Sequence, residues 1–406
     1  MITSRVFAFL TFLVAYKSSA AATSSTQSTV SATSTSTAYE LSNNTKPDIH
    51  GIQLGFNYAA TLIEGSTFAS QFSSASSLSG TNGAFKSARL YTMINSTTGG
   101  TISAIEDAIT TNTTLLFGLF ASQGDINFTK ETSALDTAIN TYGTKFTDLI
   151  YGISVGSEDL YRTSDNGADG VGDSVANIQK YIGWTRQVLA KHSLSKPVGH
   201  VDTWEIWLDQ TYGQRLLPNV DFVGMDNYPY WEYVAEDQST SNMTGTYEAV
   251  VAGVKGKPVW ITETGWPVNA PANSTDEAKP GLSEASQYWQ SVGCGWAFGK
   301  INTWWYIYND LQAVSASTTK PKPPSFGVAA SPSDACGLFD LACPAGAAIN
   351  PTSMSAASAT ATGTCSASYA KASKVVGSAA GSVRGSVVRA SIFGAMILIA
   401  RGLLFD

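Results

Sequence analysis

The sequence predicts an α/β protein whose middle part, residues 48–311, forms a (β/α)8 TIM barrel. Two observations predict this fold class. Eight short apolar runs alternate with longer stretches in which apolar residues recur at helical spacing, as at Ile102, Ile105 and Ile109. The distance between successive runs is also close to the roughly 30 residues that one strand–helix unit of such a barrel requires.

Each of the eight runs has the composition of a buried parallel strand. The runs are rich in β-branched and aromatic residues, and loop or turn residues follow them. The stretches between them are long enough for a helix that returns the chain to the start of the next strand. The runs begin near Gly51, Ser87, Leu115, Ile150, Pro197, Asp221, Pro258 and Ile301, and they read GIQLGFNYA, SARLYTM, LLFGLFA, IYGISV, PVGHVDTW, DFVGMDNY, PVWITE and INTWWYIY.

Two segments precede the barrel. In residues 1–20, Arg5 stands before an apolar run that is too short to span a bilayer, and Ser18-Ser19-Ala20 resembles a cleavage site, as in a secretory signal peptide. Residues 21–47 are mostly Ser, Thr and Ala, so we expect a disordered segment. Six N-x-Ser/Thr sequons are typical of an extracellular glycoprotein and predict glycosylation at Asn43, Asn95, Asn112, Asn127, Asn242 and Asn273.

Three segments follow the barrel. Residues 312–346 combine a Pro-rich linker with a Cys-containing extension, and residues 347–390 form a Ser/Ala/Gly-rich stalk. Residues 391–406 are an apolar tail interrupted by Arg401. Small residues at Ser378, a spacer and this tail fit a signal for a glycosylphosphatidylinositol (GPI) anchor. We therefore expect attachment at Ser378 and a membrane contact through the lipid.

Composition excludes several classes of partner. The net charge of −7 and the pI near 5.1 argue against nucleic acid or an anionic surface. The three histidines, His50, His192 and His200, lack metal-ligand spacing, so we expect no metal and no cofactor.

The four cysteines lie late in the chain, and their even number in a secreted protein suggests disulfides. Cys336 and Cys343 could close a small local loop. Alternatively, Cys294 could tie the extension back to the barrel. The sequence leaves both pairings open.

Two glutamates end apolar strands and are the candidate catalytic residues. Glu263 stands where the run in K-P-V-W-I-T-E-T-G-W-P-V stops, and Glu158 stands where the run in L-I-Y-G-I-S-V-G-S-E stops. Barrel enzymes build their sites from residues at the carboxyl ends of strands. Two carboxylates are what glycoside hydrolysis needs, one to protonate the leaving oxygen and one at the anomeric carbon.

Other polar and aromatic residues fall at the same predicted rim. Aromatic faces can stack on sugar rings, and polar side chains can bind hydroxyl groups. We predict substrate binding by Tyr58, Arg89, Tyr91, Ser157, Asp202, Asn227, Tyr228, Trp231 and Trp266.

At these residues the chain resembles family 17 of the glycoside hydrolases, in particular its fungal cell-wall branch. The resemblance covers about residues 48–311 and is carried by I-T-E-T-G-W-P, V-G-S-E-D-L-Y, R-L-Y, D-T-W and D-N-Y-P-Y-W. It implies a retaining endo-β-1,3-glucanase with Glu263 as nucleophile and Glu158 as acid/base. Two positions depart from the family pattern: Ser157 replaces an Asn, and W-W-Y-I-Y-N-D replaces a motif of the F-E-A-F-D kind.

The resemblance also implies a β-1,3-glucan substrate. Together with the signal-like N-terminus and the anchor signal, it leads us to expect a monomer that is secreted to the cell wall and the outer face of the plasma membrane. Two alternatives stay open: a β-1,3-glucanosyltransferase with the same covalent intermediate, and a wall protein that binds glucan with little or no catalysis. For a retaining enzyme we predict Glu158 and Glu263 carboxyl groups roughly 4.5–6.5 Å apart.

Overall fold

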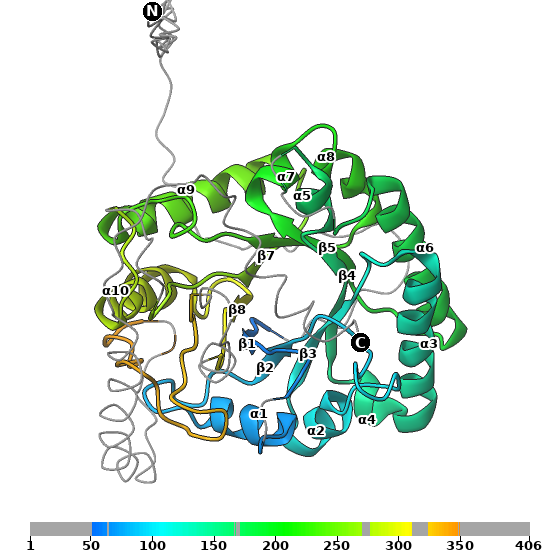
Figure 1. Cartoon of the computed structure of the whole chain (residues 1–406), viewed down its shortest axis with the longest axis horizontal. Helices are drawn as coiled ribbons and strands as arrows, with labels where there is room; N and C mark the ends of the chain where they lie inside the picture. Colours follow the sequence, from blue (N-terminus) through cyan, green and yellow to red (C-terminus); the bar gives the residue numbers. More distant parts are fainter. Residues whose placement is uncertain are drawn as a thin grey trace, which may run out of the picture. The chain divides into compact units, whose positions relative to one another are not determined.

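The computed structural model describes residues 51–62, 65–165, 167, 171–269, 277–310, 324–347 and 349. Eight parallel strands in sequence order form a closed barrel, which β1 and β8 complete by pairing with each other. Figure 1 shows the strands as a ring inside the surrounding helices. The predicted fold is confirmed, with strands β1 Leu54–Asn57, β2 Ser87–Arg89, β3 Thr114–Leu119, β4 Ile150–Ser157, β5 Val198–Thr203, β6 Val223–Asp226, β7 Val259–Glu263 and β8 Thr303–Trp305.

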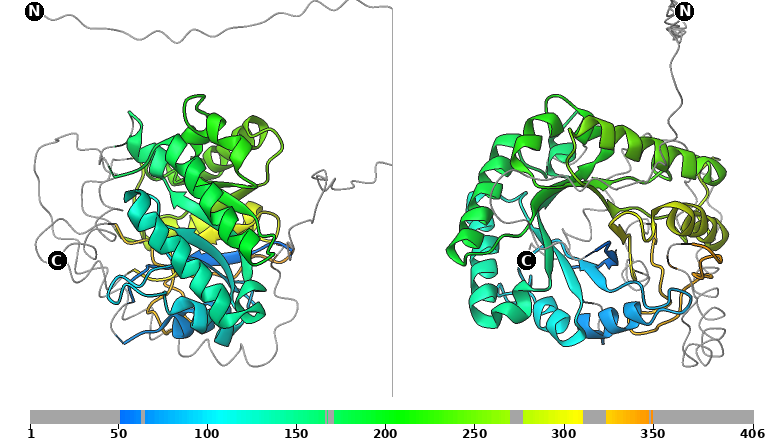
Figure 2. Two further views of the ribbon diagram at one scale, coloured as in Figure 1. Left: turned by 90° about the vertical axis from the view of Figure 1, so that its right-hand side faces the viewer. Right: turned by 180° about the vertical axis from the view of Figure 1, so that it is seen from behind.

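Helices surround the barrel and cover the outer face of its strands (Figure 2). Their apolar residues, such as Ile178 and Ile182, are buried in one large core between helices and strands. The helices are α1 Phe68–Ser76, α2 Ala104–Thr111, α3 Gly124–Tyr142, α4 Thr144–Thr147, α5 Asp159–Thr163, α6 Val175–Lys191, α7 Trp204–Leu208, α8 Gly213–Leu216, α9 Glu236–Gly253 and α10 Leu282–Tyr288, with a 3₁₀ turn Leu217–Asn219 and a π-helix Trp289–Ala297.

A separate apolar cluster fills the end of the barrel at which the strands begin. Its members come from the first residues of their strands or from the residue just before a strand. The Phe222 and Trp260 rings stack with centroids 3.8 Å apart. This plug closes one end of the barrel, which leaves the other end for a site. The plug consists of Leu116, Tyr151, Phe222, Trp260 and Trp304.

The Cys-containing extension packs on the barrel. Cys294 forms a disulfide with Cys343, with their Cα atoms 5.3 Å apart, and this excludes the local Cys336–Cys343 pairing. Cys336 is disulfide-bonded as well. Trp289 Nε1 donates to the Leu341 carbonyl at 3.1 Å. The extension therefore belongs with the barrel structurally, although its described residues, 324–346, form no strand or helix.

Several predictions concern residues outside the described ranges. These are the signal peptide, the Ser/Thr-rich segment, the linker residues 312–323, the stalk apart from residues 347 and 349, and the apolar tail, together with Asn43, Asn273 and Ser378. Within the described ranges, none of the helices has the length and apolar character needed to cross a bilayer.

Candidate active site

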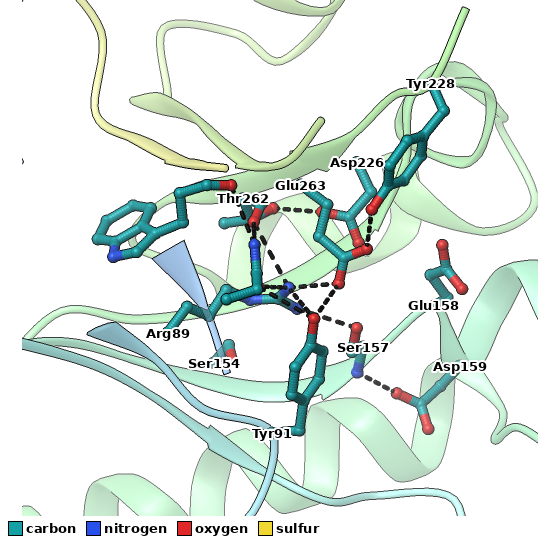
Figure 3. Close-up of polar contacts among 12 residues, drawn as sticks. Arg89, Tyr91, Ser154, Ser157, Glu158, Asp159, Asp226, Tyr228, Thr262 and Glu263 are labelled. Carbon is teal, nitrogen blue, oxygen red and sulfur yellow. Dashed lines mark hydrogen bonds and ion pairs between the residues drawn. The ribbon is translucent and has the colours of Figure 1, made fainter. Parts of the chain in front are cut away.

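Glu263 lies at the end of β7, buried to 3% exposure, with three partners around its carboxylate (Figure 3). Arg89 Nη1 forms an ion pair with Oε1. Tyr91 donates its hydroxyl to Oε1 at 2.8 Å, and Tyr228 donates to Oε2 at 2.6 Å. These three donors fix the orientation of the carboxylate, as a nucleophile requires.

The position of Glu263 depends on an irregularity in β7. Met225 pairs with Ile261, but the next residue of β6, Asp226, pairs with Glu263, so β7 has one extra residue opposite β6. Such bulges redirect side chains at the rims of barrels. Because of the shift, Glu263 and Asp226 lie beside each other at the mouth of the barrel.

Arg89 connects three residues of the site that come from different strands. Its guanidinium, 1% exposed, donates to Asn57 Oδ1 at 2.7 Å and to Ser157 Oγ at 3.0 Å, besides its contact with Glu263. Burial opposes the charged form, but Tyr91 and Glu263 raise the pKa of Arg89, so it stays charged. Arg89 thus compensates the charge of Glu263 at a place where both side chains are buried.

Glu158 follows β4 and has a left-handed backbone conformation with φ 55°, which is rare for a residue with a side chain. Its amide donates to the Val201 carbonyl at 2.8 Å, and Arg162 Nη2 donates to its Oε2 at 3.1 Å. The pKa of Glu158 is raised to about 7, mainly by burial; the charge of Arg162 opposes this rise and that of Glu263 adds to it. At mildly acidic pH Glu158 therefore carries a proton that it can donate.

The two glutamates are close enough for a retaining reaction. A carboxylate oxygen of Glu158 lies within 4.8 Å of one of Glu263. Retaining glycosidases hold their carboxyl groups about 5–5.5 Å apart, and inverting ones about 6.5–9.5 Å. The spacing argues against a water molecule between the two groups as the direct nucleophile.

Asp226 is a third carboxylate that the sequence reasoning missed. One of its oxygens lies within the same 4.8 Å of those of Glu158 and Glu263. Thr262 Oγ1 donates to its Oδ1 at 2.6 Å, while Oδ2 is buried without a hydrogen-bond partner. Burial, and then the charge of Glu263, raise the pKa of Asp226 well above its ordinary value. The sequence feature that could have identified Asp226 is its position at the end of a predicted strand, β6.

The same three carboxylates are the group of potential metal ligands that the described residues contain. Arg89 and Arg162 already supply two positive charges there. Acidic clusters are common without an ion, and no donor here is left exposed and ionised. The absence of a metal stays a prediction.

A cavity of about 380 Å³ opens on the two glutamates. Tyr91, Ser157 and Arg162 line it beside them, and Tyr306 adds an aromatic wall. The predicted residues Arg89, Tyr91, Ser157 and Tyr228 thus converge with the glutamates (Figure 3). Arg89 and Tyr228 reach Glu263 itself, so their first role is to position it.

Two polar residues predicted to bind substrate have protein partners instead. Asp202 is fully buried, and its Oδ2 accepts the Leu160 amide at 3.0 Å and contacts His200 Nε2 at 3.0 Å. Asn227 donates to Thr246 Oγ1 at 2.5 Å on α9. These contacts correct the prediction: Asp202 holds the chain after Glu158, and Asn227 faces a helix.

The aromatic residues need a similar correction. Tyr58 and Trp266 are each 2% exposed, so neither has an open face for a sugar ring. Tyr58 packs between Phe72 and Tyr308, and Trp266 donates Nε1 to the Lys279 carbonyl at 2.8 Å. Partly buried Trp231 packs on Tyr230 and Phe326 and is absent from the cavity lining. These three rings therefore pack within the protein instead of lining the cavity.

Arg162 and Tyr306 are further site residues that the sequence prediction left out. Arg162 lies four residues after Glu158 on α5, a helical spacing that brings an acid and a base together. Asp310, the last residue of W-W-Y-I-Y-N-D, lies beyond the end of β8 and does not line the cavity. It accepts the amides of Phe326 at 2.7 Å and Gly327 at 2.9 Å, so it anchors the extension.

Comparison with known proteins agrees with this geometry. A family model described as the BtgE/BtgC glycoside hydrolase domain matches residues 55–319. The chain belongs to this family. It is 44% identical over 305 residues to a probable glucan endo-1,3-beta-glucosidase, eglC, of Aspergillus fumigatus, with 72% of this chain and 65% of the relative covered. The Aspergillus oryzae protein of the same name is 44% identical over 303 residues, covering 71% and 62%.

This chain therefore spans less than two thirds of the length of the curated relatives it matches. Among solved structures, a family 17 β-1,3-glucanosyltransferase from Rhizomucor miehei has a TM-score of 0.52 at 21% identity, covering 68% of this chain and 92% of that one. An endo-laminarinase from Formosa has a TM-score of 0.55 at 13% identity, covering 68% and 82%. At these identities the two structures support the barrel fold alone.

Proposed function

We propose that the protein is a retaining endo-hydrolase of the 1,3-β-D-glucosidic linkages of fungal cell-wall β-glucan. The observation that carries the proposal is the close pair of carboxylates in opposite environments, Glu263 among donors and Glu158 buried with a raised pKa. Such a pair supplies a nucleophile and an acid at the same pH. Relatives named glucan endo-1,3-beta-glucosidase support the choice of substrate.

In the first step, Glu263 attacks the anomeric carbon while Glu158 gives its proton to the departing glycosidic oxygen. The bond from that carbon to the oxygen breaks and a glycosyl ester forms on Glu263. Arg89 and Tyr228 hold the attacking carboxylate in place, so little motion is needed to reach the transition state.

In the second step, Glu158 is ionised and takes a proton from water, which attacks the ester and frees Glu263. The loss of negative charge on Glu263 in the ester favours ionisation of the neighbouring Glu158, since the two charges repel each other. A sugar hydroxyl that attacks instead of water would give glucanosyl transfer, and the test below distinguishes the two.

Ser157, which replaces the family's asparagine, keeps a polar role in this proposal. Its hydroxyl oxygen accepts from Arg89, which leaves its own proton free to reach a sugar hydroxyl in the cavity. Because a hydroxyl is shorter than an amide, we expect a weaker hold on the sugar than the asparagine provides, with the same reaction type.

The test is product analysis on β-1,3-linked gluco-oligosaccharides, with β-1,4-linked ones beside them. We expect cleavage of the β-1,3 series, early products that are β-anomers by NMR, and no products longer than the substrate. An α-anomer at early times contradicts the covalent mechanism. Longer products indicate transfer, and binding without products indicates a glucan-binding protein.

Azide tests the two roles separately. In Glu263→Gly, azide should replace the nucleophile and give a glycosyl azide of inverted configuration. In Glu158→Ala, it should give the retained product. The reverse pattern would exchange the roles of the two glutamates.

We also propose that the enzyme is a secreted, GPI-anchored monomer at the cell wall and the outer face of the plasma membrane. The signal-like residues 1–20 and the tail 391–406 support this location. A phospholipase specific for inositol lipids should release the protein from membranes. Protein found only free in the medium with its tail intact would contradict the anchor.

A further inference from the structure

The catalytic cavity extends beyond the two glutamates, between the loop after β2 and the first turns of α3. Asn95 and Gly99 line it from the loop, and Asn127 and Lys130 line it from the helix. Half-buried Ile94 adds an apolar patch between the polar groups. This part of the cavity, which we call the amide arm, combines amides with an apolar surface, the composition that a sugar ring requires.

The two walls of the amide arm are fastened to each other. Glu131 of α3 is 4% exposed and accepts the Met93 amide at 2.7 Å and the Thr92 hydroxyl, both from the chain after β2. The loop itself closes through the Asn95 amide, which donates to the Gly100 carbonyl at 2.8 Å. The arm therefore exists before a ligand enters it, and little ordering entropy is lost on binding.

Both asparagines have fixed orientations. Asn95 Oδ1 accepts the amides of Thr97 and Thr98 at 2.9 and 3.0 Å, which leaves its Nδ2 without a hydrogen bond to a described residue. Asn127 Oδ1 accepts from Lys130 Nζ at 2.9 Å, and its Nδ2 donates to the Gln123 carbonyl at 3.2 Å. The side-chain amides of Asn95 and Asn127 therefore hold hydrogen-bonding groups in fixed positions at the cavity wall.

The sequence marks the same two asparagines as glycan acceptors, and the structure brings these two interpretations into conflict. A glycan is attached through Nδ2, so at either residue it would grow from the wall of a cavity of about 380 Å³ that glucan must enter. At Asn127 it would also displace the bond to Gln123. Asn112 differs, because it is exposed at the end of α2 and does not line the cavity.

We propose that Asn95 and Asn127 stay unglycosylated and bind the hydroxyl groups of a glucosyl unit in the amide arm, remote from the cleaved bond. The proposal rests on the function proposed above. It predicts that these residues set the affinity for longer chains, while Glu158 and Glu263 set the rate of bond cleavage.

Each sequon offers a matched pair of variants. Asn95→Asp and Asn127→Asp remove both the sequon and the amide donor. Thr97→Ala and Thr129→Ala remove the sequon and keep the asparagine, and both threonines are exposed. The experiment compares KM and kcat of these variants on β-1,3-linked oligosaccharides of increasing length. Glycopeptide mass spectrometry of the wild-type protein, secreted from a fungal host, gives the occupancy of Asn95, Asn112 and Asn127.

We expect a glycan at Asn112 and none at Asn95 or Asn127. Each Asp variant should raise KM for the longer oligosaccharides roughly two- to tenfold, the effect of one lost hydrogen bond, with a smaller change in kcat. The Thr variants should behave as the wild type. A glycan at Asn95 or Asn127 in active protein overturns the proposal, and so do Thr variants that change KM as much as the Asp variants, or Asp variants with unchanged KM.

Two controls separate the possible failures. Wild type and Thr variants that are folded but cleave no β-1,3-linked substrate would refute the proposed function rather than the amide arm alone. Thermal unfolding of each variant shows whether it folds. If Asn127→Asp does not fold, Asn95→Asp and the glycopeptide result still decide the proposal.

Discussion

The two ends of the barrel interior are built from opposite kinds of residue. At the end where the strands begin, Tyr151, Phe222 and Trp260 form an apolar plug with stacked rings. At the other end, Glu263 and Arg89 form a buried ion pair. The Glu263 and Arg89 side chains are as deeply buried as the plug, but a cavity opens on the catalytic end, so the two ends differ in charge, hydrogen bonding and access for a ligand.

This difference separates stability from function along the strands. Packing of large rings stabilises the plug because apolar surface is buried, while Tyr151 and Trp304 donate hydrogen bonds to the Gly51 carbonyl and the Ser87 hydroxyl. The catalytic end gathers three carboxyl groups within a few ångströms, which is unfavourable unless a proton and two guanidinium groups compensate them. The stability that the plug contributes can offset this cost, because strands such as β7 supply residues to both ends of the barrel.

The largest effect should come from the catalytic end. Glu158→Gln should lower kcat by about 10²–10⁴, since Gln cannot transfer the proton. Glu263→Gln should lose at least as much, because the nucleophile is gone. Initial rates on β-1,3-glucan measure this, with Glu248→Gln, an exposed glutamate on α9, as the control.

Circular dichroism and urea unfolding should find both variants folded. A Glu158→Gln enzyme that keeps most of its activity would show that the acid is another residue, with Asp226 the next to examine.

The next effect tests the plug. Trp260→Ala should lower the free energy of unfolding by about 3–5 kcal/mol, because it leaves a cavity beside Phe222 and Tyr151. Urea unfolding measures the change. Ile126→Ala, where the side chain is 79% exposed, is the matched control and should change stability by less than about 0.5 kcal/mol.

The activity of Trp260→Ala per folded molecule should stay near that of the wild type. A loss of several powers of ten in the folded variant would mean that the two ends are not separate, and that the plug positions the catalytic groups.

The pH dependence should reflect Glu158. Its pKa of about 7 lies above the ordinary value of about 4.5 because of burial, so the group is protonated below pH 7 and loses its proton above. Activity should therefore fall about tenfold per pH unit above pH 7. The same shift means that Glu158 costs stability as pH rises from about 4.5 through 7, since the folded state then buries a charge.

Measurements of kcat/KM between pH 4 and 9 show this fall in activity, the alkaline limb of the rate profile. Glu158→Gln should unfold with less pH dependence over the same range. An activity that still rises above pH 8 is incompatible with Glu158 as the acid.

The smallest effect concerns Arg162. This residue lowers the pKa of Glu158, so Arg162→Met should raise that pKa and move the alkaline limb of the rate profile to higher pH. The control is Arg186→Met, which removes an exposed ion pair between Arg186 of α6 and Asp221. This variant should leave the alkaline limb of the rate profile in place. Movement to lower pH would mean that Arg162 stabilises the protonated form of Glu158.

The sequence by itself determined the barrel and the two glutamates. Strand periodicity and length are local properties, and a carboxylate that follows a buried parallel strand must lie at the carboxyl end of the barrel. That reasoning found Glu158 and Glu263, and also Arg89 and Tyr91, because every residue at a strand end reaches the same rim.

Only the tertiary structure decided which rim residues face the axis. The extra residue in β7 sets Glu263 beside Asp226, and the left-handed backbone at Glu158 directs its carboxyl toward the same point. Asp202 and Trp266 lie at the same rim but are held by hydrogen bonds to the Leu160 amide and the Lys279 carbonyl. A strand end fixes a residue's height in the barrel, whereas register shifts and packing between distant segments fix the direction of its side chain.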